Sequence, residues 1–160
     1  MLDPTKINDL RTAELYLAAV SSAGIDEEGF IILPNGDFVH IQGEGKLLTR
    51  PIGWAVDESN GILTHCHPMP QPEERWSLSW GDLLCSISQN YKEVRAVYPH
   101  GVYRVCRPEE GWPQLDTAKY LVKQQIEEIG SSVTLRTRFE RLLEKLGGGL
   151  RLELVKHGEF

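Results

Sequence analysis

Two histidines and an aspartate are the residues of this chain whose types and spacing are best suited to chemistry. His65 and His67 are one residue apart, and Asp82 follows in the next segment of the chain. Two imidazoles and a carboxylate can hold a catalytic zinc ion, with a fourth position left open for water. Zinc lowers the pKa of that water to about 7, so hydroxide is available at neutral pH. The residues predict metal-assisted hydrolysis, with a carboxylate upstream at Glu28 to take and return the proton.

The spacing of the histidines predicts that both lie on one strand. Residues two apart in a strand point to the same face, so His65 and His67 project together while Cys66 turns the other way, into the core. Pro68 ends this strand and starts a loop. A third ligand must therefore come from elsewhere in the sequence.

Asp82 is the best-placed third ligand, because we expect it in the first turn of a helix that starts at Ser79. Two interpretations of this pair stay open. Ser-x-x-Asp at a helix start is also an ordinary capping arrangement. A lone His-x-His is likewise a weak signal. The two patterns in this order, directly before a helix, favour the metal site.

Together these residues resemble the JAMM metal-binding motif of the JAB/MPN domain family. That motif runs as an upstream Glu, then His-x-His-Pro, then Ser-x-x-Asp. The matching positions are Glu28, His65, His67, Pro68, Ser79 and Asp82. The layout is also similar to the bacterial RadC-type and phage-encoded branches, and the resemblance covers about residues 26–106.

The resemblance implies roles for each matching residue. His65, His67 and Asp82 would ligate Zn²⁺, and Glu28 would act first as general base and then as general acid. Ser79 would hydrogen-bond the developing oxyanion. The implied function is a JAMM-type zinc metalloprotease or isopeptidase that cleaves a peptide or isopeptide bond in a protein or peptide substrate, including one joined to a ubiquitin-like partner. The alternative is a non-catalytic JAB/MPN interaction or scaffold module.

The identity of the base stays open between two neighbouring residues. Glu27 and Glu28 both precede a predicted strand, and they would face opposite sides of it. Glu28 is preferred because Glu28-Gly29-Phe30 keeps the Glu-x-apolar start of the family. Either residue could instead be a solvated turn residue.

The loop between the two halves of the motif is long and rich in proline. It contains Pro70, Pro72 and the pair Glu73-Glu74, and it could grip a substrate. Trp76 and Trp80 lie at its end. They could line a substrate groove, although packing in the core is the simpler expectation.

Periodicity predicts the surrounding elements. Helical spacing of apolar residues, with caps and stops, predicts helices over residues 3–24, 115–129 and 135–146. It also predicts a helix that starts at Ser79 and buries Leu83, Leu84 and Ile87. Turn residues between apolar runs predict hairpins over 30–41 and 93–105, and alternation predicts strands at 62–67 and 150–154. Short strands are also expected at 47–48 and 52–56. These elements predict an α/β fold with a central mixed sheet flanked by helices, for which the resemblance implies a JAB/MPN (cytidine-deaminase-like) architecture.

Length and composition predict one domain. The 160 residues, 41% hydrophobic and 25% charged, fit a single globular domain. The resemblance implies a JAB/MPN-like core over about 26–106, with a helical C-terminal extension over about 113–147. No run approaches the length of a membrane span, and no signal peptide is recognised, which predicts a cytoplasmic protein. The net charge of −6 argues against nucleic-acid binding through phosphates. The C-terminal helices could form a homo-oligomer or partner face.

Overall fold

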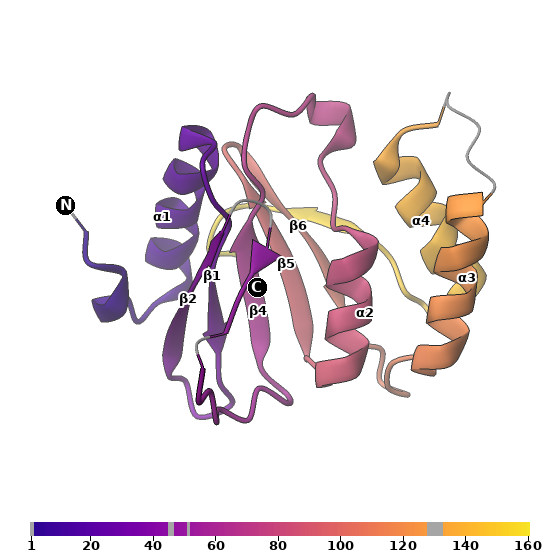
Figure 1. Ribbon diagram of the computed structural model, residues 1–160, viewed down its shortest axis with the longest axis horizontal. Coiled ribbons are helices and arrows are strands. Elements are labelled where there is room, and N and C mark those ends of the chain that lie inside the picture. Colours follow the sequence, from indigo (N-terminus) through magenta and orange to yellow (C-terminus); the bar gives the residue numbers. More distant parts are fainter. Residues whose placement is uncertain (1, 45–46, 51, 128–132) are drawn as a thin grey trace.

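A mixed β-sheet with helices on both faces forms the centre of the protein (Figure 1). The computed structural model describes residues 2–44, 47–50, 52–127 and 133–160. Within these residues the strand order is β3-β2-β1-β4-β5-β6-β7. Neighbouring strands are antiparallel except for β4 and β5, which are parallel. The predicted α/β class with a mixed central sheet is therefore confirmed.

Most strands lie close to their predicted places, but the last one begins at Glu153 instead of Leu150. Their bounds are β1 (Glu28–Ile32), β2 (Phe38–Glu44), β3 (Leu47–Leu48), β4 (Ile62–Cys66), β5 (Glu93–Tyr98), β6 (Gly101–Cys106) and β7 (Glu153–Val155). Both predicted hairpins, β1–β2 and β5–β6, are confirmed. The strand expected over 52–56 is absent. Trp54 in this segment instead donates its indole N–H to the buried carboxylate of Glu58, at 3.0 Å.

The first helix begins later than predicted. Asp3 caps only a short 3-10 turn (Pro4–Lys6), and α1 (Leu10–Ala23) starts after Asp9, whose carboxylate accepts the backbone N–H of Thr12. Periodicity predicted a single helix over residues 3–24, but the second capping aspartate starts a separate helix after the 3-10 turn. The helix ends, as predicted, at Gly24, whose positive φ of 69° suits glycine.

Three further helices follow: α2 (Trp80–Gln89), α3 (Leu115–Glu127) and α4 (Leu135–Leu146). The predicted end of the third helix, at 128–130, lies outside the described residues. The last helix ends at Gly147, as expected. Among the described residues, no helix combines the length and hydrophobicity needed to cross a bilayer.

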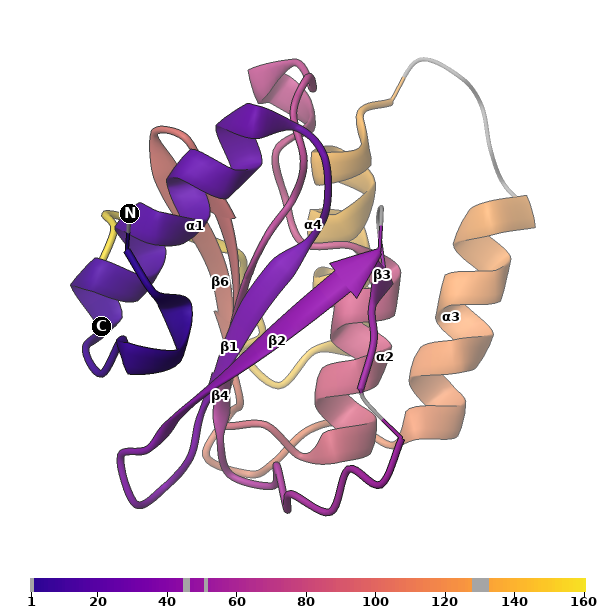
Figure 2. The same cartoon turned by 60° about the vertical axis from the view of Figure 1, so that its left-hand side comes forward.

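The two faces of the sheet carry separate cores, seen from two directions in Figures 1 and 2. One face packs against α1 through residues such as Leu17, Phe30 and Val97. The opposite face packs against α2, α3 and α4 through residues such as Leu83 and Phe139. A side chain on a central strand therefore points either toward α1 or toward α2, α3 and α4.

A buried ion-pair cluster lies on the α1 face. The guanidinium of Arg95, which is fully buried, bonds both carboxylate oxygens of Glu14, at 2.8 and 2.9 Å, and also the carboxylate of Glu93. It also donates to the backbone oxygen of Glu159, which holds the C-terminal segment against α1. The cluster joins three distant parts of the chain.

We expect Arg95→Ala to lower the free energy of unfolding by about 3–5 kcal/mol, because it leaves buried carboxylates without their cation. Urea denaturation followed by circular dichroism measures this change. Arg151→Ala is the matched control, because Arg151 is largely exposed and its ion pair to Glu153 is a surface one. Equal stability of the two variants would contradict the role assigned to Arg95.

Candidate metal centre

The two histidines converge at the end of β4. His65 lies on the strand and is fully buried, while His67 follows its last residue. Their Nε2 atoms are 3.0 Å apart. Between them, Cys66 points to the opposite face and packs into the core against α1. The predicted alternation of these three side chains is confirmed.

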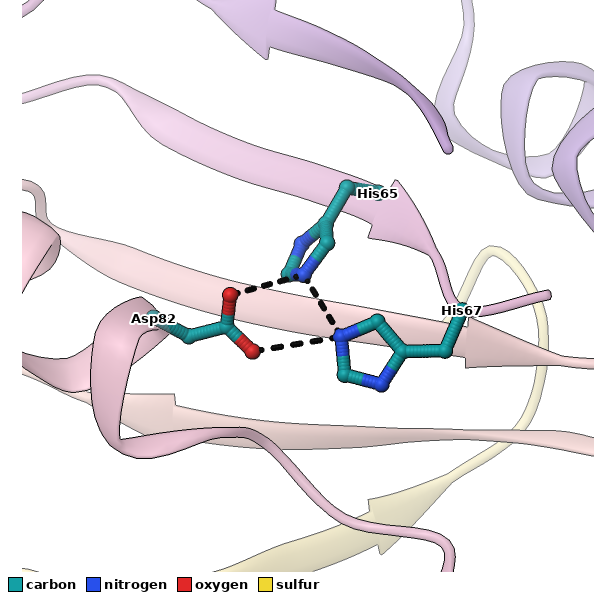
Figure 3. A group of neighbouring side chains, drawn as sticks. All are labelled: His65, His67 and Asp82. Carbon is teal, nitrogen blue, oxygen red and sulfur yellow. Dashed lines mark hydrogen bonds and ion pairs between the residues drawn. The ribbon is translucent and has the colours of Figure 1, made fainter. Parts of the chain in front are cut away.

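Asp82 completes the cluster from the first turn of α2 (Figure 3). Its Oδ1 lies 3.0 Å from Nε2 of His65, and its Oδ2 lies 3.2 Å from Nε2 of His67. Asp82 also forms a capping box with Ser79: each side chain accepts the other residue's backbone N–H. The two interpretations of Ser-x-x-Asp are therefore compatible, since the cap fixes the carboxylate that faces the histidines.

The donor atoms are gathered closely enough to share one metal ion. Ligands 2.0–2.1 Å from zinc at tetrahedral angles are about 3.3–3.4 Å apart. Here the two Nε2 atoms are 3.0 Å apart, and each lies 3.0–3.2 Å from a different oxygen of Asp82. One ligand atom from each of the three residues lies within 4.8 Å of the other two. Two imidazole nitrogens and a carboxylate oxygen are also the donor types that zinc accepts. The residues thus fit zinc in their donor chemistry and lie close enough together to share one ion.

The cluster keeps its carboxylate ionised. Burial by itself raises the pKa of Asp82, but His65 and His67 beside it hold that pKa well below its usual range. The side chains of His67 and Asp82 are only 12% and 16% exposed. An anionic ligand with little exposure to water suits a divalent cation.

Glu28, the preferred base in the sequence, does not reach this cluster. In the sheet register Gly29 lies opposite His65, so Gly29 and His65 share a face and Glu28 takes the other. Its carboxylate accepts the Tyr16 hydroxyl at 2.7 Å and bonds His40 Nε2 at 2.8 Å. Glu28 therefore connects α1 to the first hairpin. Its position on the other face argues against the sequence-based preference for Glu28 as the general base.

Glu27 lies on the side of the histidines. It precedes β1 by one residue, so it alternates with Glu28, and it lines a cavity together with His67. Gly29 keeps this face of β1 close to the site, because a Cβ there would lie 3.0 Å from the Cβ of His65. The strand geometry therefore favours Glu27, the alternative that the sequence left open.

The cavity beside His67 has a volume of about 480 Å³. Ser79 lines it with an exposed side chain, and Trp80 lines it too. Trp76 is instead buried, with its ring stacked on Tyr98 at a centroid distance of 4.9 Å. Trp80 therefore lines the cavity, whereas Trp76 packs in the core.

The wall of the cavity combines the proline-rich loop with the last long helix. Pro68, Pro70 and Pro72 line it from the loop, and Leu135 and Phe139 line it from α4. Sequence reasoning missed this role of α4. The amphipathic pattern of α4 shows which of its faces is apolar, but not which part of the protein that face packs against.

Arg136, on the first turn of α4, fastens the loop to this helix. Its guanidinium donates to the backbone oxygen of Trp76 at 2.7 Å and to that of Glu73. It also lies over the ring of Tyr103, at 4.8 Å from the centroid. The C-terminal helix therefore supports the cavity beside the His65–His67–Asp82 cluster.

The end of α1 fixes the backbone on the other side of the site. The hydroxyl of Ser21 donates to the backbone oxygen of His67 at 2.6 Å, and the backbone N–H of Met69 donates to that of Ser21 at 2.9 Å. Gly24 permits this approach, because a Cβ there would meet the backbone oxygen of Met69 at 2.2 Å. The segment carrying His67 is thus held from both faces of the sheet.

Comparison with known proteins gives one partial match. No protein-family model and no solved structure matches this chain. Over 75 residues it is 32% identical to the movement protein TGBp3 of Strawberry mild yellow edge-associated virus. The match spans 44% of this chain and the whole of the viral protein. Over that stretch, less than half of its length, the chain belongs to the same sequence family as this viral movement protein.

Proposed function

We propose that this protein is a zinc-dependent hydrolase of the JAMM type, with a JAB/MPN architecture, that cleaves a peptide or isopeptide bond. The observation that carries the proposal is the convergence of the His65, His67 and Asp82 donor atoms beside an open cavity. The order of the motif, His-x-His-Pro followed by Ser-x-x-Asp, supports the same function. The viral relative matches less than half of the chain and adds no argument about this site.

The residues of the site divide the work of amide hydrolysis. When bound, zinc supplies a water of lowered pKa and polarises the carbonyl oxygen. His65, His67 and Asp82 would hold the ion. Glu27, on the cavity side, takes a proton from the attacking water at its carboxylate and returns it to the leaving amine.

Ser79 would assist the reaction through its hydroxyl. Its Oγ accepts the backbone N–H of Asp82, which leaves the hydroxyl hydrogen for another acceptor. A donor aimed at the carbonyl oxygen stabilises the charge that develops there in the transition state. Ser79 would thus serve both the helix cap and the reaction.

The cavity favours a protein or peptide substrate. Prolines, Trp80 and Phe139 give it apolar walls, and Arg75 adds a positive charge at one side. Extended peptide chains offer apolar side chains for such walls and backbone groups for polar ones. We therefore expect a peptide segment to lie across the cavity with its scissile bond next to His67.

Zinc content and thermal stability test the proposal together. Wild-type protein dialysed against zinc should bind one ion per chain. Because bound metal stabilises the folded state, by about 2.7 kcal/mol at 100 times its Kd, EDTA should lower the melting temperature by roughly 5–10 °C. Metal analysis and calorimetry measure the two effects, and a panel of fluorogenic peptide and isopeptide substrates then tests for cleavage.

The opposite result is equally informative. A well-folded protein with no bound zinc, and with the same melting curve in EDTA, would refute the hydrolase. Such a protein would fit the alternative, in which the fold serves as an interaction or scaffold module.

A further inference from the structure

Tyr98 lies behind His67, at the end of β5, and is almost completely buried. Its hydroxyl oxygen is 2.7 Å from Nδ1 of His67. The same oxygen accepts the backbone N–H of Ser77, at 3.0 Å, and donates to the backbone oxygen of Ser77, at 2.7 Å. One phenol group thus connects the metal cluster to the loop that borders the cavity.

The hydrogen-bond roles at this phenol determine which nitrogen of His67 carries a proton. A tyrosine hydroxyl has a single hydrogen to donate. The backbone oxygen of Ser77 can only accept, so the hydrogen of Tyr98 points to it. The remaining contact can form only if Nδ1 of His67 donates to the phenol oxygen. Because Nδ1 carries a hydrogen, only Nε2, the atom that faces Asp82 and His65, can offer a lone pair to a metal ion.

The surroundings of Tyr98 hold this arrangement in place. Its ring stacks on Trp76 and meets the ring of Tyr103 edge-on at 6.1 Å. Turning the hydroxyl hydrogen of Tyr98 toward His67 would leave the buried backbone oxygen of Ser77 without its donor, at a cost of about 1–3 kcal/mol.

His65 has no comparable partner. Its Nδ1 is buried and makes no hydrogen bond within the described residues. Of the two imidazoles, only His67 has its second nitrogen held by a hydrogen bond in the structure. The orientation of the cluster therefore depends strongly on Tyr98.

We propose that Tyr98 is a positioning residue that fixes His67 as the Nδ1–H tautomer, with Nε2 directed at the metal. The part of this proposal that concerns zinc rests on the function proposed above, whereas the hydrogen bond to His67 does not. Partners of this kind orient metal-binding histidines, and their loss typically lowers metal affinity by about 10–100-fold.

Tyr98→Phe tests the proposal, because it removes the hydroxyl and keeps the ring. Tyr103→Phe is the matched control: it removes a hydroxyl from the neighbouring ring, and that ring can still carry Arg136. Zinc affinity should fall about 10–100-fold in Tyr98→Phe and stay within about twofold in Tyr103→Phe. Circular dichroism verifies that both variants are folded.

A second measurement needs neither zinc nor activity. In metal-free wild-type protein, ¹⁵N-edited NMR should show a hydrogen on Nδ1 of His67 that exchanges slowly with water. In Tyr98→Phe this slow exchange should be lost, which a merely structural role of the ring would not produce. If wild-type protein binds no zinc, the proposed function fails, but this measurement still decides the hydrogen bond.

Two results would overturn the assignment. One is a neutral His67 in wild-type protein with its hydrogen on Nε2 and none on Nδ1. The other is a folded Tyr98→Phe variant that keeps the wild-type zinc affinity and the slow exchange at Nδ1. The wild-type spectrum alone is decisive should Tyr98→Phe fail to fold.

Discussion

His67→Ala is expected to reduce bound zinc from one ion per chain to none and to abolish hydrolysis. It removes one of three ligands, and the remaining pair, His65 and Asp82, cannot hold a catalytic ion at neutral pH. The loss should exceed the roughly 10–100-fold effect of removing a hydrogen-bonding partner behind a ligand. Metal analysis after dialysis, together with titration against a competing chelator, measures it.

The control for this variant is His100→Ala, since His100 is exposed in the turn of the second hairpin. It should bind zinc as the wild-type protein does. His67→Ala should also melt at the same temperature with and without EDTA, because no metal remains to be removed. A full zinc content in His67→Ala would place the ion elsewhere and would remove the basis for the proposed hydrolase.

The parts of this site that could be predicted from the sequence follow from local rules. His65 and His67 share a face because side chains in a strand alternate, whatever the rest of the chain does. Asp82 is placed by the helix cap at Ser79, which depends on only four residues. The two hairpins likewise follow from turns between apolar runs. These features need no knowledge of distant contacts.

Which of the two glutamates lies on the face of the histidines could not be predicted, because this depends on register. Glu27 and Glu28 differ by one place, and a shift of one residue exchanges the two faces of a strand. Only the pairing of Gly29 with His65, residues far apart in the sequence, decides which glutamate lies on the face of His65, His67 and Asp82. The Glu-x-apolar pattern that favoured Glu28 contains no information about this pairing.

Contacts between distant elements explain the other differences. Tyr98 meets His67 because β5 lies parallel to β4, and α4 reaches the cavity through Phe139 and Arg136. None of these contacts leaves a local pattern in the sequence. The late start of α1, by contrast, has a local cause. Asp3 caps a short 3-10 turn and Asp9 caps the helix itself, but the apolar periodicity runs through both segments and therefore predicts one helix.

Glu27→Gln is expected to keep one zinc per chain and to lower kcat by about 10²–10⁴-fold, because an amide cannot take the proton from water. Glu28→Gln is the matched control. Its amide oxygen can still accept the hydroxyl of Tyr16, so the tie between α1 and the first hairpin stays formed. Its kcat should remain within about twofold of wild type, since Glu28 lies on the face away from the cluster.

The comparison of these two isosteric variants separates the chemical role from the structural one. Both remove one negative charge from adjacent residues, so a general electrostatic effect on the site would slow both enzymes alike. Only a proton-transfer role confines the loss to Glu27→Gln. If Glu28→Gln lost activity while Glu27→Gln kept it, the β1–β4 register would not describe the working enzyme and the sequence-based preference for Glu28 would be restored. Activity of both variants at the wild-type level would exclude either glutamate as the base.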